Sequence, residues 1–356
     1  MKSERCQYDS VFLLPHVQYI DVYRVIGDMK VLLLGATGLL GHNVLRRLLD
    51  DGHEVVVLVR RAGAIAIDGT WREVVGSLLS DADLLRAAEG CDAIINCAGI
   101  TDMSLRHLSD YLPVNAGLCR RMVSVCEQCG IKVIVHTSTV NTIGNGTCER
   151  PSKGDEPMRE PFVDSLYAKS KRAGEEFMAE AVRVHPDWHV VVINPGFILG
   201  ACDVRPSSGR MLLAAYRRRV MAAPPGGKAF VAVQDVAQAC VNALVRGISG
   251  NRYIVVNSGA CMSMADLYRL QADVTGYRQT IVALPRWLVT SAGAIGSMMR
   301  AVGVRTDLCL NNVRQLMVQE YYDGGRAVDE LGINQTPIAE AIKEFHQWRE
   351  QHFSKL

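Results

Sequence analysis

The sequence has no excess of one charge sign. Its 39 lysines and arginines are nearly matched by 37 aspartates and glutamates, which leaves a formal net charge of +2 over 356 residues. Because positive and negative charges are this closely matched, the composition gives no reason to expect a nucleic-acid partner or attraction to an anionic membrane. Low-complexity tracts and internal repeats are also missing, so a repeat architecture is not expected.

Long unbroken hydrophobic runs are missing as well. Proline, histidine and charged residues interrupt the N-terminal stretch FLLPHVQYIDVYRVIGD, so we expect neither a secretory signal nor a spanning helix there. The segment IVALPRWLVTSAGAIGSMM contains Pro285 and Arg286, and its unbroken part is shorter than the roughly 20 residues that cross a bilayer. We expect a buried or interface helix in a smaller lobe. Contact with a membrane surface is the alternative.

The cysteines do not suggest a disulfide framework or a metal site. There are 11, an odd number, scattered in apolar segments such as INCAGI and VAQACVNAL, which predicts reduced, buried thiols in a cytoplasmic protein. Cys126 and Cys129 form a Cys-x-x-Cys without a second ligand pair or a thioredoxin-like context, so we interpret them as structural. His107 and His136 have no partner pattern either, and no metal is expected.

Strand and helix patterns do alternate from Met29 onward. Short apolar, β-branched runs predict buried parallel strands at 30–34, 54–59, 73–75, 93–97, 132–136, 189–193 and 253–256. Helical spacing and capping residues predict helices at 39–51, after Ser80, and at 108–128, 164–183, 235–245 and 263–275. This alternation predicts an α/β fold, a Rossmann-type doubly wound parallel sheet with a smaller C-terminal substrate lobe.

The same pattern divides the chain into three parts. Residues 1–28 precede the first clean strand, and we expect them outside the core, partly disordered or an over-long gene start, with a short added strand as the alternative. Residues 29–196 form the predicted dinucleotide-binding domain. After Asn194-Pro-Gly the alternation loosens, so residues 197–356 are predicted to be mainly the substrate lobe, with elements interleaved into the sheet.

Three glycines follow the first strand at the spacing of a phosphate-binding loop. In GATGLLG, Gly35 permits the tight turn, Gly38 lets the backbone approach a pyrophosphate, and Gly41 allows close packing of helix and strand. The following helix offers unpaired N–H groups to the phosphates. Because strand, glycines and helix are contiguous, the segment predicts dinucleotide binding.

The end of the second strand bears on the choice of cofactor. NAD-selective folds place an acid about 20 residues beyond the glycines, whereas this chain has Arg60 and Arg61. Guanidinium groups bind a 2′-phosphate that a carboxylate would repel, so NADP(H) is favoured and NAD(H) is the alternative.

Tyr167 and Lys171, in LYAKSKRAGEEFM, lie four residues apart on a predicted helix and therefore on one face. An ammonium group near a phenol stabilises the phenolate and moves its pKa toward neutral pH. The pair can therefore move a proton at a carbonyl or an alcohol.

With these motifs in order, the chain resembles an extended short-chain dehydrogenase/reductase of the NAD-dependent epimerase/dehydratase family, nearest its dihydroflavonol-reductase-like and 3β-hydroxysteroid-dehydrogenase-like members. The resemblance spans roughly residues 29–276. It assigns the catalytic Ser/Thr position of VIVHTSTVNTIG to Thr139, with Ser138 as the neighbouring candidate. Asn115 matches a structural and proton-relay asparagine, expected to hold a water that links Lys171 to solvent.

The resemblance also implies the cofactor contacts. Beyond the three glycines, the two arginines and the Tyr/Lys pair, they fall on Thr37, Leu39, Leu40, Ser77, Leu78, Cys97, Ala98, Gly99, Thr137, Pro195, Gly196, Phe197 and Ile198. Two of these places depart from the family pattern. Gly76-Ser77-Leu78 replaces the usual Gly-Asp-Leu, and Asn96–Gly99 resembles the smaller short-chain branch.

The function predicted is NADP(H)-dependent hydride transfer between nicotinamide and a ketone, aldehyde or secondary alcohol, with Tyr167 as general acid/base. A nucleotide-sugar epimerase or dehydratase with tightly bound NAD is the alternative, and a non-catalytic cofactor-binding protein is a third. Polar residues of a substrate-side loop, Asp203, Arg205, Ser207, Ser208 and Arg210, are candidates for holding a polar substrate group, or are simply exposed. A homodimer through the helices at 108–128 and 164–183 is possible.

Overall fold

The computed structural model describes residues 29–65, 67–204, 207–259 and 261–353, so the predicted extension at 1–28 lies outside the described residues. Seven parallel strands form one sheet in the order β10-β6-β5-β4-β1-β2-β3. They are β1 Lys30–Leu34, β2 Glu54–Val59, β3 Arg72–Val75, β4 Ala93–Asn96, β5 Val133–Thr137, β6 His189–Pro195 and β10 Arg252–Val255. The predicted doubly wound parallel sheet is confirmed.

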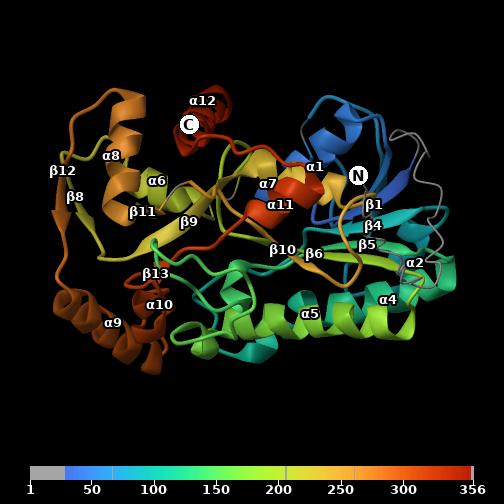
Figure 1. Cartoon of the computed structure of the whole chain (residues 1–356), viewed down its shortest axis with the longest axis horizontal. Coiled ribbons are helices and arrows are strands. Elements are labelled where there is room, and N and C mark those ends of the chain that lie inside the picture. The colour runs from blue at the N-terminus through green and yellow to red at the C-terminus, as the bar shows by residue number, and fades with distance from the viewer. Residues whose placement is uncertain (1–28, 66, 205–206, 260, 354–356) are drawn as a thin grey trace, which may run out of the picture.

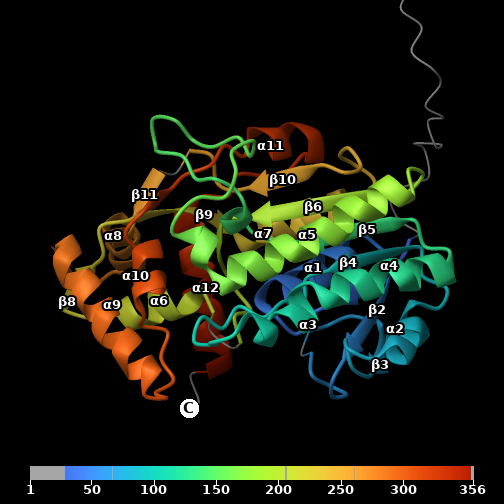
Figure 2. The same cartoon turned by 90° about the horizontal axis from the view of Figure 1, so that it is seen from below.

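Helices cover both faces of this sheet, as Figures 1 and 2 show. One face packs on α1 Leu39–Asp50, α7 Val233–Asn242 and α11 Gly325–Leu331, and the other on α2 Asp81–Ala88, α4 Gly117–Cys129 and α5 Leu166–Val184. Within β1, Val31 and Leu33 join the first core while Leu32 and Leu34 join the second. This split explains why the strand is apolar at every position, and each fully buried leucine contributes roughly 1.5–3 kcal/mol.

The helix expected at 108–128 is broken into three pieces, so that prediction was wrong. They are the 3₁₀ turn η1 Leu108–Asp110, α3 Leu112–Asn115 and α4 Gly117–Cys129. The chain leaves helical geometry at Ala116, where φ is −122°. The break brings the carbonyl of Asn115 against α5, since a Cβ added at Gly174 would lie 2.4 Å from that oxygen.

The smaller lobe is built around a second sheet, seen on the left in Figure 1. Its strands are β7 Phe197–Leu199, β9 Gly227–Ala232, β11 Cys261–Ser263 and β13 Gln319–Glu320, and β8 Val220–Ala223 pairs separately with β12 Thr280–Ala283. The helices are α6 Gly209–Ala215, α8 Met264–Thr275, α9 Arg286–Ala301, α10 Leu310–Gln315 and α12 Ile338–Phe353. Apolar residues of α8, α12 and β9 make the core of this lobe.

Two expectations about the apolar segments need correction. Cys148 and Cys261 form a disulfide between Cα atoms 5.6 Å apart, so not every described cysteine is a reduced, buried thiol. The segment 281–299, expected to be a buried or interface helix, forms the end of β12 and most of α9. Most of its large apolar side chains are exposed, so the buried alternative is wrong. Within the described residues, no helix has the length and hydropathy needed to cross a membrane.

Candidate functional site

The loop between β1 and α1 is built for close approach to a ligand. Gly35 has φ +86°, and a Cβ added there would lie 2.6 Å from the backbone nitrogen of Ala98. A Cβ added at Gly41 would lie 2.1 Å from the Gly35 carbonyl oxygen. Gly38 begins α1 without a capping side chain, so the first N–H groups of the helix have no side-chain acceptor. Thr37, Leu39 and Leu40 complete this turn, whose shape fits a dinucleotide pyrophosphate.

Arg60 and Arg61 follow β2, which pairs with β1 in parallel, so they lie at the same edge of the sheet as the glycine loop. Both are exposed. Ser77 and Leu78 follow β3, one strand further out. The backbone N–H of Ser77 donates to Asp83 Oδ2 at 2.9 Å, so a carboxylate from α2 holds this loop even though position 77 is not an acid.

Lys171 is buried where β4 and β5 end. Its Nζ donates to the backbone carbonyl of Thr137 at 2.8 Å, and a Cβ added at Gly99 would lie 3.1 Å from that nitrogen. Burial lowers the pKa of Lys171, and the nearby Cys119 and Cys97 act in the opposite direction. The structure thus brings together Gly99, Thr137 and Lys171, three of the residues predicted from the sequence.

Tyr167 lies one helical turn before Lys171 on α5, with its side chain hydrogen-bonded to that of Thr139. Burial raises the pKa of Tyr167 to about 12 and outweighs the lowering effect of Thr139. The sequence predicts that Lys171 lowers the pKa of Tyr167. The structure gives the opposite direction, because desolvation of the phenolate dominates. The phenol is therefore protonated at neutral pH. Ser138 is also buried, and within the described structure its hydroxyl has no hydrogen-bond partner.

Asn115 fixes the loop that follows β4. Its Oδ1 accepts from the N–H of Ile100 at 2.7 Å, and its Nδ2 donates to the Ile100 carbonyl at 3.0 Å and to Ser170 Oγ at 2.9 Å. These bonds occupy the amide, which ties the loop to α5 beside Lys171. In this geometry Asn115 positions the backbone, and the expected water-holding role has not been tested.

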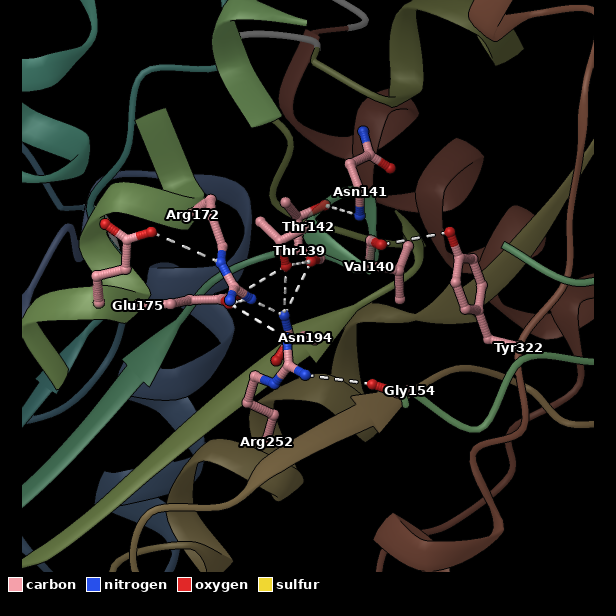
Figure 3. A network of polar contacts seen from close by, with 11 residues as sticks. Thr139, Val140, Asn141, Thr142, Gly154, Arg172, Glu175, Asn194, Arg252 and Tyr322 are labelled. Carbon is pink, nitrogen blue, oxygen red and sulfur yellow. Dashed lines mark hydrogen bonds and ion pairs between the residues drawn. The ribbon is translucent and has the colours of Figure 1, made fainter. Parts of the chain in front are cut away.

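A buried acid that was not predicted from the sequence stabilises the turn that carries Thr139. Glu175, another helical turn beyond Lys171 on α5, lies 2.7 Å from Thr142 Oγ1 and accepts from Asn194 Nδ2 at 2.7 Å. The same amide donates to the carbonyl of Thr139 at 2.9 Å. Figure 3 shows this network. Glu175 also forms ion pairs with Arg172 at 3.4 Å and with Arg252 at 3.5 Å. The i, i+4, i+8 spacing of Tyr167, Lys171 and Glu175 was the available signal.

The residues at and after the end of β6 have different partners. The Asn194 side chain donates to Glu175 and to the Thr139 carbonyl, and Pro195 ends β6 at the cofactor edge. A Cβ added at Gly196 would lie 2.2 Å from the Ala229 carbonyl, so this glycine lets β9 approach. Phe197 and Ile198 begin β7, which pairs with β9.

The ends of β4 and β5 hold a small cluster of weak donors. Cys97 Sγ lies 3.8 Å from Thr137 Oγ1, which in turn lies 3.7 Å from Cys240 Sγ on α7. The backbone N–H of Ala98 donates to Asn96 Oδ1 at 3.0 Å, so a side-chain contact holds the turn that leads to Gly99.

This arrangement can be compared with known proteins. The family model described as "NAD dependent epimerase/dehydratase family" matches residues 31–259, more than half of the chain. The chain belongs to this family. It is therefore an enzyme of the extended short-chain dehydrogenase/reductase type that acts with NAD(P).

Two curated members of the family are similar over nearly their whole length. A putative dihydroflavonol 4-reductase of Synechocystis is 28% identical, over 89% of this chain and 94% of the relative. Sterol demethylase protein B of Methylococcus capsulatus is 28% identical, over 90% of this chain and 98% of the relative. Among solved structures, gox2253 is similar in fold, with a TM-score of 0.77 at 23% identity over 91% of this chain and 98% of that one.

The substrate-side loop differs from its predicted role within the family fold. Asp203 is buried, and its carboxylate accepts from the backbone N–H groups of Ser207 and Gly209 at 2.9–3.1 Å. Burial raises the pKa of Asp203. Arg210 pairs with Asp307 at 3.2 Å, and the Ser208 hydroxyl is buried. Asp203 and Arg210 thus hold the lobe together, and Arg205 lies outside the described residues.

A hollow of about 440 Å³ opens beside the loop that follows the Thr139 turn. Its lining residues come from that loop, from Arg159, and from the smaller lobe: Asn145, Gly146, Thr147, Pro225, Arg286, Met317, Val318 and Gln319. Loops of the dinucleotide-binding part and segments of the smaller lobe both contribute, as expected for a small-molecule site between lobes.

Proposed function

We propose that the chain is an NADP(H)-dependent oxidoreductase that interconverts a lipophilic ketone or aldehyde and the matching alcohol. The observation that carries the proposal is the hydrogen bond between Thr139 and a half-buried Tyr167, the pKa of which desolvation raises to about 12. A phenol that stays protonated at neutral pH is equipped to donate a proton to a developing alkoxide, which favours the reductive direction.

Each side chain has a separate task in this reaction. The bound nicotinamide supplies the hydride during reduction and accepts it during oxidation. Thr139 orients the substrate oxygen by hydrogen bonding, and Tyr167 gives that oxygen its proton. Lys171, held by the Thr137 carbonyl, places a positive charge near the phenolate that remains. Asn115 keeps the loop after Gly99 against Lys171.

The preference for NADP(H) is supported by Arg60 and Arg61. They lie at the cofactor edge, where an NAD-selective fold places an acid, and they are exposed and thus available to a 2′-phosphate. NAD(H) would lack the group that these guanidinium groups bind.

The substrate class is supported by the relatives and by the composition of the smaller lobe. One relative is named for dihydroflavonol reduction and another for sterol demethylation. Both names point to rigid, largely apolar molecules. The hollow beside the Thr139 turn is lined by Pro225, Met317 and Val318 as well as by polar groups. We therefore propose a substrate of moderate to high hydrophobicity with one reacting oxygen.

The test is turnover of NADPH against a panel of sterol-like and flavonoid-like ketones, with Tyr167→Phe as the inactive variant. Loss of the proton donor should lower kcat by about 10²- to 10⁴-fold while NADPH still binds. Tyr268→Phe, which changes a buried tyrosine of α8, is the matched control. Unchanged turnover in Tyr167→Phe would contradict the mechanism. NAD that stays bound through purification, with turnover of nucleotide sugars, would favour an epimerase or dehydratase.

A further inference from the structure

Helix α9 presents its large apolar side chains to solvent. Trp287 is 69% exposed, Met298 70% and Val302, just past the helix, 80%. With Ile295 between them, the spacing of four, three or eight residues keeps these side chains on one face, and Leu288 and Met299 border it. These six residues are called the α9 apolar face. An exposed cluster of this kind marks an interaction surface.

The opposite face of α9 carries small residues. A Cβ added at Gly296 would lie 1.6 Å from the carbonyl oxygen of Leu308, and one added at Gly293 would lie 2.3 Å from Val313 of α10. The helix therefore packs tightly on α10 and the segment before it through its glycines. Its bulky apolar residues are left outside, the reverse of an ordinary amphipathic helix of a globular core.

The charge around this face is of one sign. From residue 274 to residue 306 the sequence contains arginines at 278, 286, 300 and 305 and no aspartate, glutamate or lysine. Arg305 pairs with Asp102 at 2.6 Å. Among the described residues neither Arg286 nor Arg300 pairs with a carboxylate, since they donate to the carbonyls of Met317 and Leu105. An apolar face whose own segment carries only arginines, and whose neighbour Asp102 is paired with Arg305, is complementary to an anionic lipid surface.

Each end of α9 contacts a segment that neighbours the candidate site. Arg286, at its first turn, lines the hollow beside the loop that follows the Thr139 turn. At the other end, Arg300 donates to the carbonyl of Leu105 at 2.6 Å, in the loop that Asn115 ties to Lys171. A surface that holds α9 would therefore lie next to the way into the substrate lobe.

We infer that the α9 apolar face docks on an anionic lipid bilayer, with Trp287 at the level of the headgroups, and that the enzyme takes its substrate from that bilayer. The substrate part of this inference rests on the proposed function, whereas the docking does not. A second copy of the chain is the less favoured occupant. The helices expected at a dimer interface, α4 and α5, cover the sheet of the other lobe (Figure 1). The arginines beside α9 would also repel their own copies across a two-fold axis.

The experiment is sedimentation of the full chain with vesicles of phosphatidylcholine, alone and mixed equally with phosphatidylglycerol. We expect binding to the anionic vesicles that weakens as salt is added, because salt screens the arginines. Trp287→Ser with Met298→Ser should lower the bound fraction at least about tenfold. Val245→Ser with Ile248→Ser, which removes two exposed apolar side chains from the loop after α7, should not change it.

Three results would overturn the inference. They are no sedimentation with either vesicle, binding by the α9 variant that equals that of the parent protein, and an α9 variant whose oligomeric state in solution changes while its vesicle binding does not. The α9 variant should keep its NADPH-dependent turnover of a water-soluble ketone and lose turnover of a ketone dissolved in vesicles. A protein that binds vesicles through α9 but reduces no ketone would support the docking and refute the proposed function, so the two failures are distinguishable.

Discussion

The side-chain amide of Asn194 donates to the buried carboxylate of Glu175 at 2.7 Å, and the same amide donates to the backbone carbonyl of Thr139. A strand end, a long helix and the turn with the candidate catalytic hydroxyl are thus joined at one point. The position of Thr139 relative to Tyr167 depends on a carboxylate that does not itself face the proposed substrate.

Removing that carboxylate should harm both stability and turnover. Glu175→Ala removes the buried carboxylate shared by the Asn194 amide and two arginines, so the free energy of unfolding should fall by about 3 kcal/mol. Glu175→Gln, which keeps an acceptor oxygen, should retain most of the stability. Denaturant titration and kcat measure the two effects. Glu176→Ala, on the exposed side of the same helix, is the control, and an equal loss in that variant would contradict this role.

The arginines after β2 should decide between the two cofactors. Arg60→Ala or Arg61→Ala should weaken NADPH binding by about tenfold through loss of a charge-assisted contact to the 2′-phosphate. NADH, which has no such group, should bind as before and serves as the control within each variant. Titration calorimetry measures both dissociation constants. Equal weakening for NADH would show that the arginines do not discriminate.

Adding one methyl group to the glycine loop should weaken cofactor binding. In Gly41→Ala the new Cβ would lie 2.1 Å from the Gly35 carbonyl, so the turn must shift where the phosphates are expected. We predict at least about a tenfold loss of affinity for NADPH. Gly259→Ala is the control, since its Cβ would meet nothing nearer than 3.8 Å. Normal NADPH affinity in Gly41→Ala would place the cofactor elsewhere.

His346 should make the fold sensitive to mild acid. It is buried on α12, lies 3.0 Å from the Gln271 amide, and burial lowers its pKa to about 4. The unfolded chain binds this proton at about pH 6.5, so stability is complete above that pH and falls as the pH drops toward 4. The loss reaches about 3 kcal/mol below pH 4.

Denaturant midpoints measured between pH 7 and 4 check this slope, with His346→Gln as the variant that should flatten it. His352→Gln, at an exposed position of the same helix, should keep the slope of the parent protein. A His346→Gln protein with an unchanged slope would assign the acid sensitivity to other groups.

The sheet was predictable because its inner parallel strands are buried on both faces and so appear in the sequence as short apolar runs. The broken helix at 108–128 was not predicted, although Pro113 in the first turn of α3 was a local signal for one boundary. The bonds between Asn115 and Ile100 cross a loop, and no local spacing reveals them. The exposed face of α9 was not predictable for a related reason. Apolar content shows that a surface needs a partner, but only the packing of Gly293 and Gly296 shows which side faces the protein.

The same contrast between local spacing and long-range contacts applies to the candidate site. The spacing of the glycines and of Tyr167 and Lys171 is local, so it could be recognised in the sequence. The partners of Glu175 come from three separate segments, and the pKa of Tyr167 is set by burial that only the folded chain creates. Arg60 and Arg61 could be placed at the sheet edge from the sequence, since parallel strands end together.

Strand β10, contributed by residues 252–255, forms the edge of the sheet beside β6, and α7 covers α1 and the strands beneath it. The nucleotide-binding half is thus completed by chain that enters the smaller lobe and returns. A fragment that ended at residue 196 would expose the hydrogen-bonding edge of β6 together with the apolar surface of α1. Such a fragment should aggregate when produced alone, so engineering of this enzyme has to exchange loops within the intact chain and cannot transplant its first half.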